Sequence, residues 1–266
     1  MPAQNDLPPL DFLPLQDPAN MRPFVEEVDG LLNLRFDMAT VQSAMRPSDP
    51  FALELEYTRT MMRFLLFCAS PKSMLMIGMG GGSHAKYCHQ TLPQADITMV
   101  EVNPHVIALR ERFLVPAESA RFRVIQNDGV RYVLKLTCAD PPKVRYDVIF
   151  VDAFHFDGAP RGFASRAFFK ACRTLLSPRG VMVMNLESEP AHSQPAMAQL
   201  GAAFDGGVWS VLTDTSGNRI AFASTPDHLM TTMRQADARL AALALVHRET
   251  LTRRVSNRLN FEPLFS

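Results

Sequence analysis

A glycine-rich segment between two apolar runs constrains this chain more than any other feature. Residues 74–77 are apolar, glycines follow at positions 78, 80, 81 and 82, and a second apolar run ends in the carboxylate of Glu101. This order is that of a strand, a tight turn, a helix and a second strand, as in the βαβ units that bind nucleosides. Glycines let the backbone approach a ligand, and an acid at the end of the second strand accepts hydrogen bonds from ribose hydroxyls. The segment therefore predicts a site for an adenosine-type ligand.

The spacing of the glycines bears on which ligand of that type binds. Dinucleotide sites place a pyrophosphate at the helix N-terminus and use the pattern Gly-x-Gly-x-x-Gly. From position 78 this chain reads Gly-Met-Gly-Gly-Gly-Ser-His-Ala, so Ser83 replaces the last glycine of that pattern. The replacement favours S-adenosylmethionine-type ligands, which carry no phosphate, over NAD.

The pattern of apolar segments predicts an α/β fold with a doubly wound, Rossmann-like, mostly parallel seven-stranded sheet. Strands of this sheet are expected at 74–77, 97–101, 122–126, 147–151 and 181–185, with a closing antiparallel hairpin formed by 209–212 and 219–223. Helices are expected at 54–68, 103–113 and 165–176, and a turn at 177–180. A small N-terminal antiparallel β unit is predicted from strands at 24–28, 31–36 and 40–45.

The same pattern divides the chain into four segments. These are a proline-rich arm over 1–22, an N-terminal β-hairpin unit with a linking helix over 23–70, a Rossmann-like catalytic domain over 71–225, and a C-terminal helical tail over 226–266.

Composition excludes several classes of partner. Lys plus Arg and Asp plus Glu both total 27, so the formal net charge is zero and nucleic acid is not an expected partner. Apolar runs are too short to span a bilayer, and the N-terminus lacks a leader pattern, so a cytoplasmic protein without membrane contact is expected. The four cysteines have no metal-binding or disulfide spacing and are expected to be reduced, buried thiols. No metal is expected, and His84 and His155 are interpreted as loop or surface residues.

Acidic residues follow four of the predicted parallel strands. Glu101, Asp128, Asp152 and Glu187 each come at or just after the carboxyl end of a strand. In open α/β sheets, ligands bind beyond these ends, at one edge of the sheet. Each acid alone also fits a cap or a turn, but together they predict one acidic site.

Several motifs carry a resemblance to a known family. They are Val-Gln-Ser at 41–43, the glycine loop, Val-Glu-Val-Asn-Pro at 100–104, Asn-Asp-Gly at 127–129, Tyr-Asp-Val-Ile-Phe-Val-Asp at 146–152, Asn-Leu-Glu-Ser-Glu-Pro at 185–190 and Ser-Gly-Asn at 216–218. With these motifs the chain resembles, over roughly residues 24–225, the spermidine synthase (polyamine aminopropyltransferase) family. That family has the class I S-adenosylmethionine-dependent methyltransferase fold.

The resemblance implies how the site works. Gln42, Glu101 and Asp128 would hold the thioadenosine part of decarboxylated S-adenosylmethionine, and Asp152 would act as the base. An alkyl amine has a pKa near 10.4, so a proton must leave before its nitrogen can attack the carbon beside a sulfonium. Donor-binding residues are expected to be Gln42, Gly78, Gly80, Gly81, Glu101, Val102, Asn127, Asp128 and Gly129. Residues expected to bind a small-molecule di- or polyamine are Asp152, His155, Asp157, Glu187 and Asp214.

The chain departs from the family at three places. Gly81 stands where the family's glycine loop carries an acid, His155 replaces the second acid of the loop that begins at Asp152, and Asp214-Thr215 replaces a tyrosine. Two alternatives to aminopropyl transfer therefore stay open: methyl transfer from S-adenosylmethionine on the same fold, and non-catalytic binding of adenosyl compounds or polyamines. A homodimer is expected from the resemblance.

Overall fold

The N-terminal part of the protein is a three-stranded antiparallel sheet. In the computed structural model, which describes residues 19–138, 141–152, 161–215, 217–252 and 262–263, its strands pair in the order β1-β2-β3. Their bounds are β1 (Phe24–Val28), β2 (Leu31–Arg35) and β3 (Ser43–Met45). The predicted hairpin is confirmed. The third strand begins later than expected because Asp37 Oδ1 accepts the amides of Ala39 and Thr40 at 2.7 Å, which holds this segment in a turn.

The main sheet has the predicted doubly wound, mostly parallel topology. Seven strands lie in the order β6-β5-β4-β7-β8-β10-β9, and the two-residue β11 (Glu262–Pro263) extends the β9 edge. All pairs from β6 to β8 are parallel, whereas β10 is antiparallel to both neighbours. The bounds are β4 (Ser73–Ile77), β5 (Asp96–Glu101), β6 (Phe122–Gln126), β7 (Tyr146–Val151), β8 (Leu176–Glu187), β9 (Val208–Leu212) and β10 (Asn218–Ala223).

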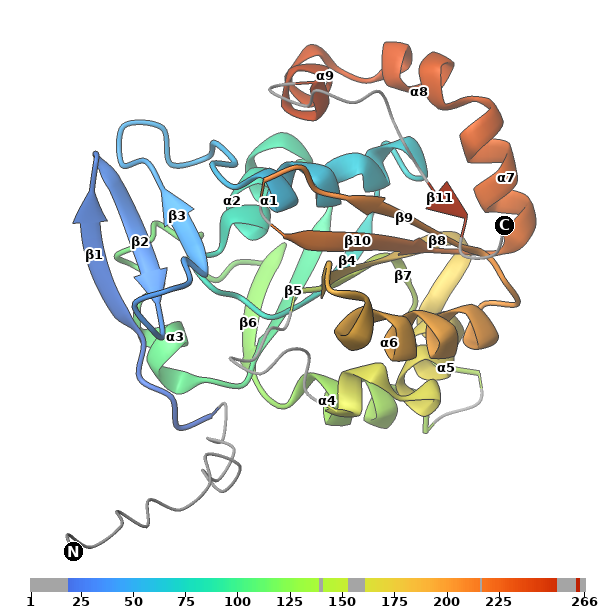
Figure 1. Ribbon diagram of the computed structural model, residues 1–266, viewed down its shortest axis with the longest axis horizontal. Coiled ribbons are helices and arrows are strands. Elements are labelled where there is room, and N and C mark those ends of the chain that lie inside the picture. Colours follow the sequence, from blue (N-terminus) through green and yellow to red (C-terminus); the bar gives the residue numbers. More distant parts are fainter. Residues whose placement is uncertain (1–18, 139–140, 153–160, 216, 253–261, 264–266) are drawn as a thin grey trace, which may run out of the picture.

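Helices cover both faces of this sheet (Figure 1). One face is covered by α1 (Glu56–Met61), the 3₁₀ helix η2 (Met62–Leu66), α2 (Ser83–Thr91) and the C-terminal helices α7 (Pro226–Arg234), α8 (Ala236–Ala242) and α9 (Leu245–Thr252). The other face is covered by α4 (Gly129–Leu136), the 3₁₀ helix η3 (Arg161–Ala164), α5 (Arg166–Leu175) and α6 (Pro190–Ala203). The short α3 (Pro104–Ala108) lies next to the N-terminal sheet.

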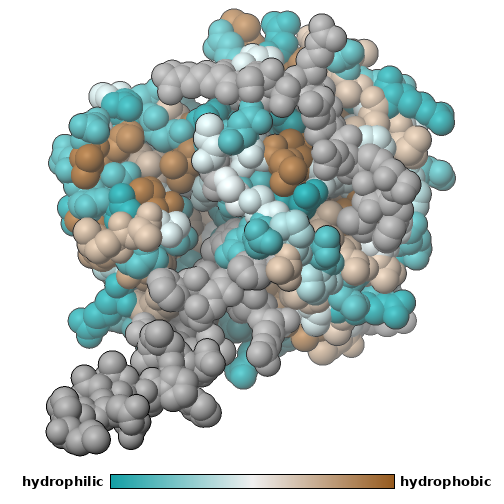
Figure 2. Space-filling model, in the orientation of Figure 1, coloured by the Kyte–Doolittle hydropathy of each residue, from teal (hydrophilic) through white to brown (hydrophobic). Residues whose placement is uncertain are grey.

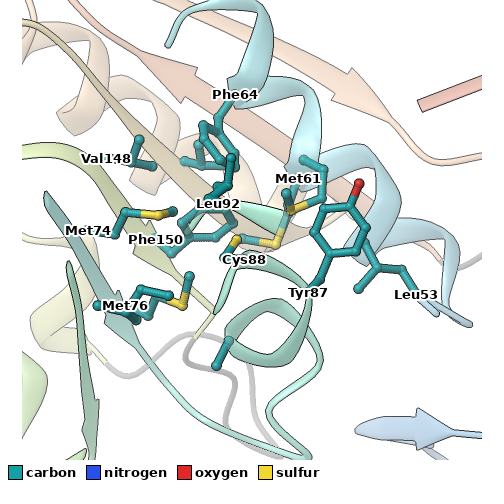
Figure 3. Packing of buried hydrophobic residues seen from close by; sticks show 14 of the residues in the cluster. Leu53, Met61, Phe64, Met74, Met76, Tyr87, Cys88, Leu92, Val148 and Phe150 are labelled. Atoms are coloured by element: carbon teal, nitrogen blue, oxygen red, sulfur yellow. The ribbon is translucent and has the colours of Figure 1, made fainter. Parts of the chain in front are cut away.

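Alternating side chains of the buried strands supply the two cores. Met74 and Met76 of β4 belong to the core beneath α1 and α2, whereas Leu75 and Ile77 belong to the core beneath α4 to α6. Figure 3 shows the first core at Phe64 and Phe150, whose ring centroids are 5.3 Å apart and nearly perpendicular. Such edge-to-face packing fixes α1 and η2 against β7, and this places the start of α1 beside the carboxyl ends of the strands.

Besides β3, two further elements differ from their predicted bounds. The helix that starts after Asn103 ends at Ala108, although a helix to residue 113 was expected. Tertiary contacts determine the backbone after Ala108 instead of helix preference. Phe113 is buried, and its carbonyl oxygen accepts a hydrogen bond from the Lys86 ammonium at 2.9 Å. The turn expected at 177–180 is instead part of β8, where the register against β7 shifts between Tyr146 and Val148.

The surface is mixed in polarity. Figure 2 shows hydrophilic and hydrophobic residues interspersed on one face, with apolar residues on the N-terminal sheet at the left. All four cysteines are free; Cys88 and Cys172 are buried as expected, but Cys138 is exposed because it follows the last turn of α4 at the surface. Within the described ranges, no helix has the length and apolar character needed to cross a bilayer.

Candidate active site

A cavity of about 920 Å³ lies where the parallel strands end, between the main sheet and the N-terminal unit. Its floor comes from the ends of β4 to β8, and its walls from β2, the segment before β3, the start of α1 and the loop between β9 and β10. This volume is in the range of small-molecule sites. The cavity is at the edge predicted for the ligand.

The glycine loop after β4 is shaped by its contact with the N-terminal unit. Gly80 has a φ of +50°, and a Cβ there would lie 2.6 Å from Ser43 Oγ, so only glycine fits. The Gly81 amide donates to the same Ser43 oxygen at 2.9 Å. Gly78 and Gly80 line the cavity, whereas Gly81 is buried between Ser43 and Phe113 and is not among the lining residues.

Glu101 ends β5 and joins the glycine loop to the next turn. Its Oε2 accepts the Met79 amide and its Oε1 accepts the Asn103 amide, both at 2.8 Å. Burial raises the pKa of Glu101 above its ordinary value, although these amide bonds act in the opposite direction. Each carboxylate oxygen can accept more than one hydrogen bond, so Glu101 retains acceptor capacity toward the cavity it lines.

Asp128 and Gly129 form the junction between β6 and α4. Asp128 caps α4, because its Oδ1 accepts the Arg131 amide at 2.7 Å. A Cβ on Gly129 would come within 2.3 Å of Ile77 Cγ2, so glycine is required for the close approach of α4 to β4. Both residues also line the cavity. The motif therefore forms the turn into α4 and also lies at the predicted site.

Asp152 follows β7 at the floor of the cavity, with its side chain 18% exposed. Its Oδ1 accepts Asn185 Nδ2 at 2.9 Å, and the Asn185 side-chain oxygen in turn accepts Asn218 Nδ2 at 3.0 Å. Burial raises the pKa of Asp152 above its ordinary value, an effect that His84, Asn185 and Tyr57 partly oppose. A carboxylate with a raised pKa is a stronger base than an ordinary aspartate.

Glu56, at the start of α1, holds the loop between β9 and β10. Its two oxygens accept the amides of Asp214 and Thr215 at 2.8 Å, and the Thr215 hydroxyl at 2.5 Å. Burial acts to raise the pKa of Glu56, but the bonds from Thr215 and Asp214 outweigh it and lower the pKa. The clamp places Asp214 on the cavity wall.

Most residues singled out from the sequence come together at this cavity. Its lining includes Gln42, Gly78, Gly80, Glu101, Val102, Asn127, Asp128, Gly129, Asp152, Glu187 and Asp214. His155 and Asp157 lie outside the described residues.

Sequence reasoning missed the contribution of the helices. Glu56 and Tyr57 line the cavity from α1, and His84 lies behind it in α2. The interpretation of His84 as a loop or surface residue is wrong: it is 8% exposed, and its Nδ1 lies 3.7 Å from Asp152 Oδ2. Its place directly after the glycine loop was the available signal, since the first turn of that helix faces the strand ends.

The cavity wall is strongly acidic. Among the described residues, one arginine, Arg59, lies on the wall with eight carboxylic acids: Asp37, Glu54, Glu56, Glu101, Asp128, Asp152, Glu187 and Asp214. Charge of one sign around a cleft attracts ligands of the opposite sign. The site therefore suits cationic ligands, although the whole chain carries no net charge.

The strand order, the glycine loop and the acid after β5 define a class I S-adenosylmethionine-dependent methyltransferase-like fold. Residues 54–202 match the family model described as the spermine/spermidine synthase domain. The polyamine aminopropyltransferase of Chromobacterium violaceum is 35% identical over 205 residues, which are 76% of each chain. This chain belongs to the spermidine synthase (polyamine aminopropyltransferase) family.

Two solved structures support the fold. A probable spermidine synthase from Corynebacterium glutamicum aligns with a TM-score of 0.63 at 19% identity and covers 84% of both chains. Human methyltransferase-like protein 13 aligns with a TM-score of 0.62 at 22% identity, covering 71% of this chain and 94% of that one.

Proposed function

We propose that this chain transfers the aminopropyl group of decarboxylated S-adenosylmethionine to a di- or polyamine. The observation that carries the proposal is Asp152, a carboxylate with a raised pKa at the floor of an acidic cavity. Both co-substrates are cations, because the donor carries a sulfonium and the acceptor an ammonium. The family relationship supplies the reaction type, and the acidic wall supplies the complementary charge.

The donor would lie across the strand ends with its nucleoside toward β5 and β6. Glu101 would accept hydrogen bonds from the ribose hydroxyls, and Asp128 would accept one from the adenine amino group. Gln42 and the glycine loop would close over the thioether side. Gly80 allows that loop to pass close to Ser43.

The acceptor would lie next to Asp152. Its ammonium would donate a proton to a carboxylate oxygen of Asp152, and the freed nitrogen lone pair would attack the donor carbon beside the sulfur. The carbon–sulfur bond breaks with its electron pair passing to sulfur, so methylthioadenosine leaves as a neutral thioether. Glu187 and Asp214 would hold the remaining positive charge of the amine, together with His155 and Asp157.

Methyl transfer is the second candidate because of two features of the site. Gly81 stands where the family carries an acid for the aminopropyl ammonium, and Arg59 places a cation on the wall. A cation suits the carboxylate that intact S-adenosylmethionine retains and its decarboxylated form lacks. The eight carboxylic acids on the wall favour the decarboxylated donor over the carboxylated one.

The test compares donors directly. Calorimetry with methylthioadenosine, S-adenosylmethionine and decarboxylated S-adenosylmethionine is followed by mass spectrometry of reactions with a series of diamines and polyamines. Tighter binding of the decarboxylated donor, with an acceptor that gains an aminopropyl group, is the expected result. A methylated product would support methyl transfer, the second candidate. Binding without turnover of any amine would indicate a non-catalytic binding protein.

A further inference from the structure

We propose that His84 is a positioning residue that completes the base: its Nδ1 shares one proton with Asp152 Oδ2 during the reaction. The inference rests on the proposed transfer reaction for its kinetic consequence, but the pairing of the two side chains is a property of the protein alone. It adds a second proton-accepting group to a site in which Asp152 alone serves as the base.

The ring of His84 is held in one orientation by its surroundings. It lies in the first turn of α2, is 8% exposed, and packs at 5.1 Å between centroids against Phe150, the β7 residue shown in Figure 3. The Tyr57 ring lies edge-on to it, with 6.3 Å between the ring centroids. Its Nε2 lies 3.2 Å from the Thr58 carbonyl oxygen, so one nitrogen faces α1 and the other faces Asp152.

The partner on Nε2 determines the tautomer. A carbonyl oxygen can only accept a hydrogen bond, so Nε2 must carry a proton to bind the Thr58 oxygen. In the neutral ring Nδ1 then has a lone pair, and this lone pair faces Asp152 Oδ2 at 3.7 Å. The distance is longer than a hydrogen bond, and roughly 0.7 Å of movement would make one. Two acceptors that face each other in this way repel unless a proton lies between them, so a proton taken up by either one favours a hydrogen bond between the two.

The charged and titratable neighbours of the pair come from several elements. Tyr57 of α1 lies close enough to Asp152 to influence its pKa, and the Tyr57 hydroxyl donates to the Gln42 carbonyl oxygen at 3.2 Å. Burial, and to a smaller extent the charge of Asp152, raise the pKa of Tyr57 well above its ordinary value, so the hydroxyl keeps its proton. The more distant groups on the same wall are Glu56 and Arg59 of α1, Glu187 of β8 and Asp214 of the β9–β10 loop.

The pair provides a second location for the substrate proton. The acceptor ammonium gives its proton to Asp152, and the carboxylic acid then shares it with His84 Nδ1, forming an imidazolium beside a carboxylate. Nε2 keeps its own proton throughout and stays bound to the Thr58 oxygen. Because Asn185 fixes the other carboxylate oxygen, Oδ2 is held toward the ring. The proton is therefore moved away from the amine while its lone pair attacks.

Titration of the histidine ring tests the pairing without any substrate. In a ¹⁵N-labelled protein, long-range ¹H–¹⁵N spectra distinguish Nδ1 from Nε2, and the signals absent from His84→Gln identify His84. The neutral ring should carry its proton on Nε2. Burial lowers the pKa of His84 while Asp152 raises it, so Asp152→Asn should move its protonation to lower pH by roughly 1 pH unit.

A matched control uses the other end of the same strand. Asp147 lies at the amino end of β7, where it accepts the Lys72 amide and is far from the cavity. Asp147→Asn should therefore leave the His84 titration unchanged. A neutral ring protonated on Nδ1, or a midpoint that is the same in the wild type and Asp152→Asn, would overturn the proposal.

Kinetics then test the consequence for transfer. His84→Gln keeps a polar group but cannot take up a proton, and the introduced amide can donate to the carboxylate, which makes Asp152 a weaker base. We expect kcat to fall about 10–100-fold with the donor KM unchanged, and the acid limb of the pH–rate profile to move to lower pH. Loss of kcat with an unmoved limb would indicate a purely structural histidine. If the wild type transfers nothing, the proposed function fails, whereas the ring titration still decides the pairing.

Discussion

Two aspartates at the opposite ends of β7 show how place in the fold sets the role of a side chain. Asp147 lies near the start of β7, where its Oδ2 accepts the amides of Lys72 and Ser73 at 2.8 and 3.3 Å. Asp152 follows the end of β7, where the parallel strands leave an open edge and its partners are side chains. The first is a structural acceptor, whereas the second faces the cavity and can exchange a proton.

Replacing Asp152 with asparagine should separate binding from transfer. Asp152→Asn is expected to lower kcat by about 10²–10⁴-fold, because the base is lost, while calorimetric affinity for methylthioadenosine stays near the wild-type value. In the wild type, the carboxylate form is lost as the pH falls through its pKa. Since burial raises this pKa above 3.8, the acid limb should lie at higher pH than for an ordinary aspartate. Asp147→Asn should keep wild-type kcat, and equal loss of affinity and transfer in Asp152→Asn would show a structural role.

Glu101 should govern affinity for the nucleoside. In Glu101→Gln one acceptor oxygen becomes a donor, so charge-assisted bonds to ribose hydroxyls worth about 1.5–3 kcal/mol are lost. Affinity for methylthioadenosine should fall about 10–100-fold by calorimetry, with a circular dichroism spectrum like that of the wild type. The control is Asp96→Asn, at the exposed start of the same strand β5. Unchanged affinity in Glu101→Gln would remove the ribose role.

At this scale the sequence predicts the residues that directly follow strands. Glu101, Asp128 and Asp152 could be located because the end of an apolar run is visible in one dimension. Glu56 and His84 could not, since their partners are 158 and 68 residues away and only packing brings them together. No local signal marks Glu56, and the only signal for His84 is its place directly after the glycine loop, which does not reveal its partner.

Among the secondary-structure elements, α1 connects the centre of the main sheet to the loop between β9 and β10. It packs through η2 against β7, and Glu56 binds the loop between β9 and β10. The N-terminal sheet is joined to the glycine loop through Ser43 and the Gly81 amide. Movement of α1 would therefore disturb the cavity wall at the loop between β9 and β10.

Glu56→Gln should loosen this loop and destabilise the protein. The amide group would face donors from Asp214 and Thr215, and the free energy of unfolding should fall by about 1–3 kcal/mol in urea titrations at pH 7. The folded-state pKa of Glu56 lies below 4.5, so its contribution is present above that pH and disappears as the pH falls through the lowered value. The difference between wild type and variant should shrink accordingly. Glu118→Gln, at an exposed ion pair, should cost less than about 1 kcal/mol, and an equal cost would contradict the clamp.

Sequence patterns predict which elements exist better than where they end. The parallel strands and the closing hairpin follow from apolar runs and turn residues. The helix after Asn103 ends early because burial of Phe113 and its bond from Lys86 outweigh local helix preference. The start of β8 depends on a register shift against β7, which no single strand reveals.

At the scale of the whole molecule, the cavity is formed by two sheets. The main sheet supplies the strand ends, and the N-terminal unit supplies the opposite wall, including Leu34, Phe36 and Gln42. The Asn103 side chain also donates to the Met21 carbonyl at 2.7 Å, so the chain enters the N-terminal sheet from the rim of the site. Without residues 23–70 the cavity would therefore lack the wall opposite the strand ends.

The assembly state stays a prediction that light scattering can test. The resemblance implies a homodimer, so size-exclusion chromatography with light scattering should give about twice the chain mass of 29.7 kDa. Dilution should show whether activity depends on the dimer. A mass of one chain across the concentrations used in the assays would contradict this expectation.

The most direct test is a crystal structure with methylthioadenosine and the preferred amine bound together. The nucleoside should occupy the cavity at the strand ends, with its ribose hydroxyls on Glu101 and its sulfur toward the glycine loop. One amine nitrogen should lie within about 2.6–3.2 Å of an Asp152 oxygen and point at the sulfur. A nucleoside bound elsewhere, or an amine held away from Asp152, would contradict the account.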